Sequence, residues 1–295
     1  MLHPWFKLLG LKSSFFNEWC LFIQPQRILL LQLNRPIKHG LKSMVVHKQV
    51  IELPLEVGVS AEVKQQVIIQ ALVQALASVQ YKGAVVSVVL SNHFARYAII
   101  PWNAGLTDEH ERQAFMQHCF SQAYGEPAKA WNLRMNSPDF GKNTIASAIA
   151  QSFLQDLHGI CADAGVTLIA VHPHLMLAVN QTLSAVKKHH QEASFWLVVV
   201  QSGQLCLAFV ERGDWRLVKT VALNIDVSAE VGALIQREMV SGNVQENWPK
   251  FLYWPESSYT QSMTLGGFDM IKVLPHAFDM QSGQLSNLAT SLAAA

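Results

Sequence analysis

The residues of greatest chemical interest form a short polar hinge between two apolar runs. The runs are 195–200 and 205–210, and the hinge consists of Gln201, Ser202, Gly203 and Gln204. A strand, a glycine turn and a second strand is how several nucleotide-binding folds hold a phosphate, because glycine lets backbone N–H groups approach the phosphate oxygens. The segment has three interpretations: a phosphate loop, a phosphate loop that has lost its chemistry, or a plain hairpin.

Other polar residues lack a catalytic spacing. His172 and His174 are two residues apart, which can place both on one face of a strand, but no third metal ligand stands nearby. Ser91 and His93 have the same spacing, and we interpret them as a polar turn rather than a nucleophile with its base. The glycine patterns of phosphate loops, Rossmann folds and nucleophile elbows are absent. The sequence therefore predicts no metal site and no catalytic residue.

The elements that would position the hinge follow a pattern that occurs twice. Apolar alternation predicts strands at 27–36, 42–53, two within 83–102, 128–135, 166–171, 195–200, 205–210, 214–223, 250–255 and 267–275. Helical spacing predicts helices at 60–80 with Ser60 as N-cap, from Thr107 to about Tyr124, and at 143–164, 174–188 and 228–240. Each half begins with strands joined by tight turns and then gains a helix.

This duplication predicts the fold class. We expect an α/β protein with a two-lobed, actin-like (ribonuclease H-like) fold, in which duplicated mixed sheets are flanked by helices. The expected division is an N-terminal segment 1–24, a first lobe with an inserted subdomain at 25–172, and a second lobe at 173–295.

Composition limits the class of protein and of partner. Of the 295 residues, 50% are hydrophobic and 15% are charged, which is typical of a folded domain with a large core. The formal net charge of +1 argues against binding of nucleic acid through bulk electrostatics. The four cysteines are far apart in the sequence and are expected to be reduced core thiols: Cys20, Cys119, Cys161 and Cys206.

The N-terminal segment 1–24 is basic and apolar. Aromatic and leucine residues beside lysines suit a helix lying on a membrane surface, which here would use Trp5, Phe6, Lys7, Leu8, Leu9 and Lys12. A plain docking segment and a frayed terminus are the alternatives. Neither a signal peptide nor a spanning apolar run is evident. We expect a protein that is soluble or rests on a membrane without crossing it.

Three stretches together resemble a known family. They are "VVSVVLSNHFARYAIIPW" with the helix after it, "LHGICADAGVTLIAVHPHLMLAVN", and "WLVVVQSGQLCLAFVERGDWRLVKTVAL". In pattern and order these are similar to the PilM-like, actin-like cytoplasmic proteins of type IV pilus assembly, whose relative in type II secretion is GspL. The likeness covers about residues 25 to 275.

The resemblance implies a cytoplasmic protein at the inner membrane. Members of the family bind the short cytoplasmic tail of a membrane partner and link it to the pilus or secretion machinery. Some members bind ATP between the lobes, whereas GspL-like members serve as scaffolds.

The resemblance also implies where a nucleotide would bind, and this chain departs from that pattern. Actin-like sites use two Asp-x-Gly hairpins, whose aspartates hold Mg²⁺ through its water shell. In the second hairpin Gly203 is present but Gln201 replaces the aspartate, and the first hairpin, expected at Leu33-Asn34-Arg35-Pro36, has neither residue. Without metal ligands phosphoryl transfer loses most of its catalysis. A pseudo-ATPase without a cofactor is expected, and an active Mg-ATP-binding ATPase or an unrelated two-lobed α/β enzyme are the alternatives.

A second glycine pair offers a possible adenine-side contact. Gly266 and Gly267 in "TLGGFDM" could approach an adenine, but in this fold such a pair should open a helix. The residues after the pair alternate like a strand, which favours a simple turn.

Overall fold

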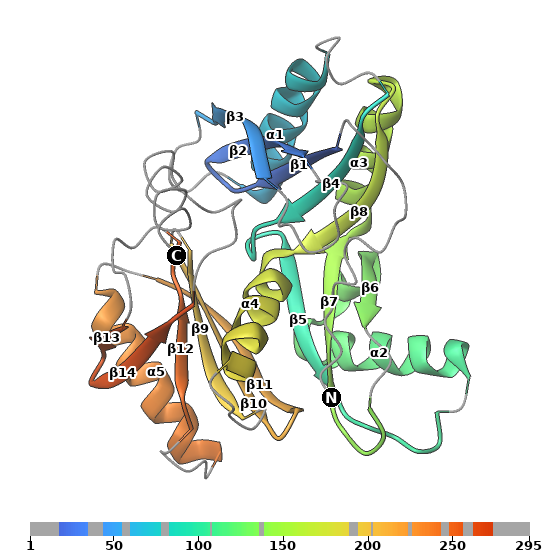
Figure 1. The fold of residues 1–295 in the computed structure, drawn as a ribbon. Helices are drawn as coiled ribbons and strands as arrows, with labels where there is room; N and C mark the ends of the chain where they lie inside the picture. Colours follow the sequence, from blue (N-terminus) through green and yellow to red (C-terminus); the bar gives the residue numbers. More distant parts are fainter. Residues whose placement is uncertain are drawn as a thin grey trace.

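A computed structural model describes residues 18–34, 44–54, 60–77, 83–106, 108–135, 139–188, 194–201, 203–223, 226–242, 248–255 and 262–273. The predicted membrane-surface residues, from Trp5 to Lys12, and Ser202 of the hinge lie outside these ranges. Figure 1 shows two lobes, each built on its own sheet, and a smaller subdomain beside the first lobe.

The first lobe is a five-stranded mixed sheet in the order β3-β2-β1-β4-β8. Its strands are β1 (Glu18–Ile23), β2 (Arg27–Asn34), β3 (Met44–Glu52), β4 (Val85–Leu90) and β8 (Thr167–Pro173). The first three strands pair antiparallel, whereas β1, β4 and β8 are parallel. Helices α1 (Ala61–Leu76) and α3 (Gln151–Asp163) contribute to the core against this sheet. Ser60 accepts a hydrogen bond from the Val63 N–H, so the predicted N-cap of α1 is confirmed.

Strand β1 was not predicted from the sequence. The first lobe was expected to begin at residue 25 and the first strand at 27, which placed the first hairpin turn after β2. In the structure β1 precedes β2, and the turn between them is Gln24 to Gln26. Every residue of β1 is buried, and the strand lies between β2 and β4 at the centre of the sheet. A strand covered on both faces has no polar alternation to reveal it.

The second lobe repeats the pairing of the first. Its sheet has the order β11-β10-β9-β12-β14-β13. The strands are β9 (Phe195–Gln201), β10 (Gln204–Glu211), β11 (Asp214–Ala222), β12 (Lys250–Tyr253), β13 (Ser262–Leu265) and β14 (Phe268–Lys272). As in the first lobe, three strands pair antiparallel and the first of them runs parallel to two later strands. The duplicated mixed sheets are thus confirmed, and β13 is a strand that the sequence did not predict.

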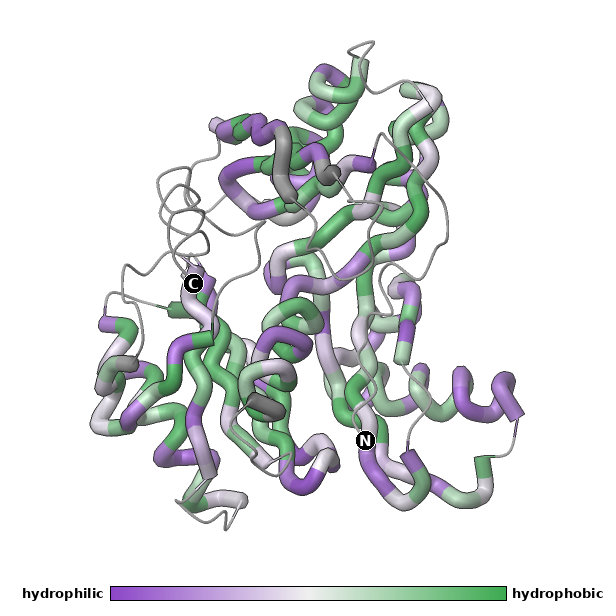
Figure 2. The backbone as a smooth tube through the Cα atoms, in the orientation of Figure 1, coloured by the Kyte–Doolittle hydropathy of each residue, from purple (hydrophilic) through white to green (hydrophobic). Residues whose placement is uncertain are grey.

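Helices cover both faces of the second sheet. Leu205, Leu207 and Phe209 of β10 pack in a cluster with α5 (Val227–Gly242). Cys206, Ala208 and Val210 of the same strand join the larger core that includes α4 (His174–Lys188). This two-sided burial explains the continuous apolar run of residues 205–210. The hydropathy colouring in Figure 2 shows green hydrophobic stretches on this sheet beside purple hydrophilic ones.

The inserted subdomain stands between β4 and α3 in the chain. It has a separate sheet, β5-β7-β6, made of β5 (Ala95–Ile100), β7 (Thr144–Ala150) and β6 (Trp131–Met135). Helix α2 (Glu109–Tyr124) and a short 3₁₀ helix (Glu126–Ala130) pack against it. The helix predicted at 143–164 is wrong in its first part, because "TIASAIA" is strand β7. The N-cap of α2 is Asp108, which accepts from the Glu111 N–H, rather than Thr107, which is not described.

The four cysteines are free thiols, three of them buried. Burial raises the pKa of Cys161 to about 11 and that of Cys206 to about 12, since the thiolate would lack solvation. Within the described residues, no helix combines the length and the hydropathy that a membrane crossing needs.

Candidate functional site

The side chain of Gln201 joins the two lobes. It stands at the end of β9 and is 6% exposed. Its Oε1 accepts from the Asn92 N–H (3.1 Å) and the Ser91 hydroxyl (3.3 Å), both of the first lobe. Its Nε2 lies 2.6 Å from Nδ1 of His174, the first residue of α4. Because an amide N–H₂ only donates, Nδ1 of His174 accepts, and the amide is bonded at both ends.

Asn92 holds the first-lobe side of this contact. Its Oδ1 accepts from the Tyr97 hydroxyl (2.7 Å) and from the Leu175 N–H (3.0 Å). Leu175 lies in the first turn of α4, whose N–H groups have no partner within the helix. Asn92 therefore ties the corner after β4 to β5 and to the start of α4. Ser91, Asn92 and His174 are each at most 1% exposed. Buried hydrogen-bonded networks of this kind resist rearrangement, because breaking one of these bonds leaves a buried polar group without its partner.

Ser91 and His93 lie in the polar turn that the sequence predicted, in which the Phe94 N–H donates to the Ser91 carbonyl (3.0 Å), and their side chains also contact each other. Ser91 Oγ lies 2.8 Å from His93 Nδ1. The serine is 1% exposed and its hydroxyl also reaches Gln201, so no substrate can approach it as a nucleophile. The pair is part of the buried network.

Neither hairpin turn between the lobes offers an acid. Gly203 has a φ of 71°, which fits the glycine of a tight hairpin. The first turn, Gln24-Pro25-Gln26, differs from the predicted Leu33-Asn34-Arg35-Pro36 but likewise contains neither aspartate nor glycine. Pro25 also lacks an N–H that could meet a phosphate. Among the described residues, no three potential ligand side chains are grouped as a metal site requires. The residues present do not fit a magnesium nucleotide.

Gly266 and Gly267 lie away from this network, in the turn between β13 and β14. Both have positive φ, and they open a strand rather than a helix. The Gly266 N–H donates to Ser228 of α5 (2.9 Å), and a Cβ atom on Gly266 would overlap the backbone of Gly232. Gly266 is required for the close packing of this hairpin on α5, whereas Gly267 has open space around it and suits the turn through its positive φ.

A groove of about 480 Å³ separates the inserted subdomain from the core of the first lobe. One wall is β8, the last strand of the first sheet, and the opposite wall includes β6, the last strand of the inserted sheet. It is lined by Asn132, Arg134, Ser147, Ile149, Gln151, Leu154, Gln155, His158 and the β8 residues 168–173. Ile169 is 38% exposed, high for an isoleucine on a strand. Burial lowers the pKa of His172, at one end of β8, to about 4.

The sequence reading located Gln201 and Gly203 correctly in a hairpin but missed their partners. Asn92 and His174 lie 109 and 27 residues from Gln201. The only local signal was the polar "SNH" directly after a fully buried strand.

Solved structures of other proteins share this fold. No protein-family model matches the sequence, and no curated protein matches it. Among solved structures, the PilM–PilN type IV pilus biogenesis complex matches with a TM-score of 0.59 and 13% identity over 93% of this chain and 95% of the other. The cytoplasmic domain of EpsL, an inner-membrane component of the Vibrio cholerae type II secretion system, matches with 0.53 and 10% over 93% and 95%.

A third match is to a Bacteroides thetaiotaomicron protein of unknown function with an actin-like ATPase fold. Its TM-score is 0.54 at 11% identity, over 94% of this chain and 88% of the other. These identities establish the fold alone: the protein has an actin-like fold similar to those of PilM and the EpsL cytoplasmic domain, as the sequence predicted.

Proposed function

From this actin-like fold, we propose that the protein is a catalytically silent scaffold of a type IV pilus or related secretion system. In this role it binds the cytoplasmic tail of an inner-membrane protein. The observation that carries the proposal is the neutral, hydrogen-bonded side chain of Gln201. Where an actin-like ATPase would place an acid to hold Mg²⁺, this chain has a neutral amide that is hydrogen-bonded to the opposite lobe.

Both the charge and the geometry oppose hydrolysis. A hard divalent cation prefers carboxylate and water oxygens, and Gln201 offsets none of its charge. Moving Gln201 toward a nucleotide would leave the Asn92 N–H and His174 Nδ1 unpaired, at about 1–3 kcal/mol for each buried group. The network therefore favours the present position of Gln201 over one that points toward a nucleotide.

The groove between β6 and β8 is the surface we assign to the tail. Among the described residues β8 is the last strand of its sheet, and an extended peptide can add to such an edge as a further strand. The partly exposed Ile169 gives an apolar contact, and Arg134 is the one permanent charge in the lining. These features suit an extended, mostly apolar tail.

Nucleotide binding is tested by thermal unfolding with and without Mg-ATP. We expect no change in Tm and no release of phosphate. A clear rise in Tm that Gly203→Arg abolishes would instead support the active ATPase. Gly141→Arg is the matched control, because Gly141 has the same backbone conformation (φ 73°) with open space around it in the inserted subdomain.

Tail binding is tested with synthetic N-terminal tails of single-span proteins encoded beside the gene. We expect one tail to bind and Ile169→Asp to weaken it at least about tenfold, which is about 1.4 kcal/mol. Val63→Asp is the control, since Val63 is a similarly exposed residue on α1. The scaffold proposal fails if no tail binds and deletion of the gene leaves pili and secretion intact.

The location that goes with this function is the cytoplasmic face of the inner membrane. The residues before β1, with Trp5, Phe6 and Lys7 among them, would assist by resting on anionic lipid. Flotation with vesicles containing phosphatidylglycerol tests this idea. Equal flotation of the full chain and of a Trp5→Glu, Phe6→Glu variant would contradict it.

A further inference from the structure

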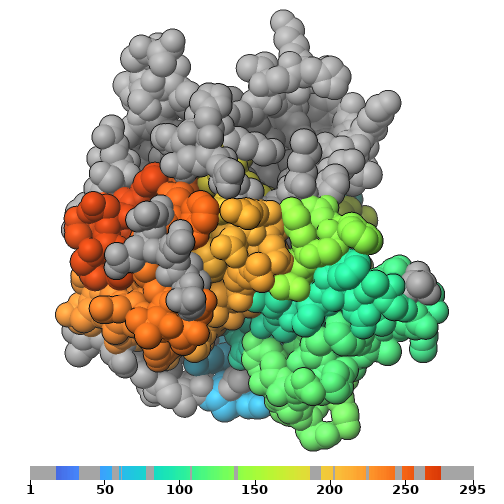
Figure 3. All heavy atoms as spheres, turned by 90° about the horizontal axis from the view of Figure 1, so that it is seen from below, coloured from blue at the N-terminus to red at the C-terminus, as the bar shows by residue number. Residues whose placement is uncertain are grey.

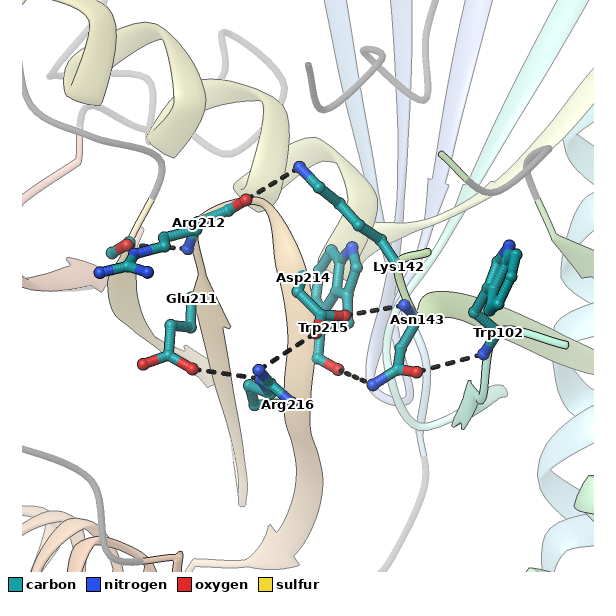
Figure 4. A network of polar contacts seen from close by, with 9 residues as sticks. Trp102, Lys142, Asn143, Glu211, Arg212, Asp214, Trp215 and Arg216 are labelled. Atoms are coloured by element: carbon teal, nitrogen blue, oxygen red, sulfur yellow. Dashed lines mark hydrogen bonds and ion pairs between the residues drawn. The ribbon is translucent and has the colours of Figure 1, made fainter. Parts of the chain in front are cut away.

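A second contact between the lobes centres on Asn143, the residue before β7 (Figure 4). Its N–H donates to Asp214 Oδ1 (2.7 Å), and its Nδ2 donates to the Trp215 carbonyl (3.4 Å). Its Oδ1 accepts from the Trp102 N–H (3.2 Å), just beyond β5. One side chain thus joins the ends of β5 and β7 to the start of β11. The neighbouring Lys142 ammonium donates to the Arg212 carbonyl (2.9 Å).

The second-lobe side of this contact is a strained turn. Arg212 and Gly213, between β10 and β11, have φ values of 50° and 80°. Positive φ at both central residues is the geometry of a type I′ hairpin, and an arginine there costs about 1–2 kcal/mol. The Arg212 N–H donates to Ser194 Oγ (2.8 Å), while its carbonyl receives Lys142. Arg212 is strained and is hydrogen-bonded on both sides, which indicates that the position of this turn is fixed by its surroundings.

Polar contacts with the second lobe hold the inserted subdomain in addition to its packing in the main core, which includes Tyr97, Ile145 and Ile149. Its sheet shares no strand with the first sheet, and the chain joins it to the first lobe at only two places, 91–94 and 150–151. Seen from below, in Figure 3, its green and teal atoms meet the amber atoms of the second lobe along a seam. The Asn143 contact joins the same two parts of the molecule, at the end of β7 farthest from α3.

Strand β7 links the Asn143 contact to the tail groove. Its beginning is held by Asp214, and its later residues Ser147 and Ile149 line the groove. It also pairs with β6, whose Asn132 and Arg134 form the same wall. Asn132 in turn donates to Gln151 at the start of α3 (3.2 Å). A shift of β7 relative to the second lobe would therefore move one wall of the groove against β8.

We propose that Asn143 and Asp214 are positioning residues for the tail groove: their contact fastens β7 to the second lobe and so sets the distance between β6 and β8. The inference rests on the groove having the role given under the proposed function. Through this contact, the second lobe, which supplies none of the described lining residues, controls how a partner peptide fits.

The distance across the groove tests the proposal without any ligand. Pulsed electron resonance measures this distance between two spin labels in the full-length Cys119→Ser protein. One label is attached at Arg134→Cys on β6 and the other at Ile169→Cys on β8. We expect a single narrow distribution that broadens and shifts when Asp214→Ala is added. Asp214→Asn should restore the narrow distribution, because its amide oxygen still accepts from the Asn143 N–H.

The matched control is Arg216→Gln. Arg216 forms ion pairs with Glu211 (3.2 Å) and Asp214 (3.3 Å) but makes none of the Asn143 hydrogen bonds. Its loss should leave the distribution narrow. Circular dichroism confirms that each variant is folded. Identical distributions for the parent and Asp214→Ala would overturn the proposal, as would equal broadening by Arg216→Gln.

A failure here is separable from a failure of the proposed function. If the tail binds in the groove but the distribution is insensitive to Asp214, the groove keeps its role and the positioning idea is wrong. If no tail binds but the distribution broadens as expected, the mechanical link stands and the groove serves another occupant.

Discussion

The two contacts between the lobes lie at opposite ends of strand β10 and use different chemistry. At one end Gln201, which pairs with Gln204 across the strands, is buried among neutral groups. At the other end Asp214, which pairs with Glu211, is 16% exposed and uses a charged carboxylate with Arg216 nearby. An unpaired charge is very costly in a buried site, whereas water stabilises one near the surface. The buried contact at Gln201 therefore depends on complete hydrogen bonding, whereas the outer contact at Asp214 tolerates a charge.

Breaking the buried contact should have the largest effect. Gln201→Ala leaves the Asn92 N–H, the Ser91 hydroxyl and His174 Nδ1 without their present partner. We expect a loss of about 3–4 kcal/mol in the free energy of unfolding, measured by urea titration. Gln204→Ala on the same hairpin is the control, with an expected change within about 0.5 kcal/mol. Equal losses of stability in the two variants would show that the hydrogen bonds of Gln201 do not account for the effect.

Acid should weaken the buried region through His172, two residues from His174. The pKa of His172 falls to about 4 in the folded protein, below the ordinary value near 6.5. As the pH drops through 6.5 the unfolded chain takes up a proton that the folded protein resists, so stability declines until about pH 4, by up to about 3 kcal/mol. His172→Gln should lack this part of the decline in urea unfolding between pH 7 and pH 4. A parallel pH profile for the two proteins would refute the prediction.

Breaking the outer contact should cost less. Asp214→Ala removes a charge-assisted hydrogen bond that is partly open to water, for which we expect about 1–2 kcal/mol by urea unfolding. Arg216→Gln should change stability by no more than about 0.5 kcal/mol, because its ion pairs are exposed. An Asp214→Ala loss as large as that of Gln201→Ala would remove the distinction between the two contacts.

The smallest effect should be a gain. Arg212→Gly relieves a positive φ and keeps both backbone hydrogen bonds of residue 212, so Tm should rise by the equivalent of about 0.5–1 kcal/mol. Calorimetry of the two proteins measures this shift. A loss of stability would mean that the arginine side chain itself stabilises the turn.

The sequence predicted most of the fold, because several elements carry strong local signals. Helix α4 was predicted at its observed residues, and the second-lobe strands follow clear apolar runs bounded by Gly203 and Gly213. The failures have local causes. Strand β1 is buried on both faces, and "TIASAIA" of β7 is small and apolar, so neither pattern separates strand from helix.

The candidate site was predictable only in part. The absence of acids in the hinge could be read directly from Gln201 and Gly203. The hydrogen-bond network around Gln201 could not be predicted from the sequence, because it forms between residues up to 110 positions apart when the two lobes pack together. Likewise, nothing local links Asn143 to Asp214, which are 71 residues apart. Such contacts follow from topology rather than from periodicity.

The environment of Gln201 also limits how this chain could evolve. Replacing Gln201 with aspartate would shorten the side chain by one methylene and remove the N–H₂ that His174 Nδ1 now accepts from. The opposite turn would still carry Pro25 between two glutamines. A magnesium site would thus require changes at both turns, and the change at Gln201 alone would already leave Nδ1 of His174 without its present donor. One substitution therefore could not supply the two acids that an actin-like site uses.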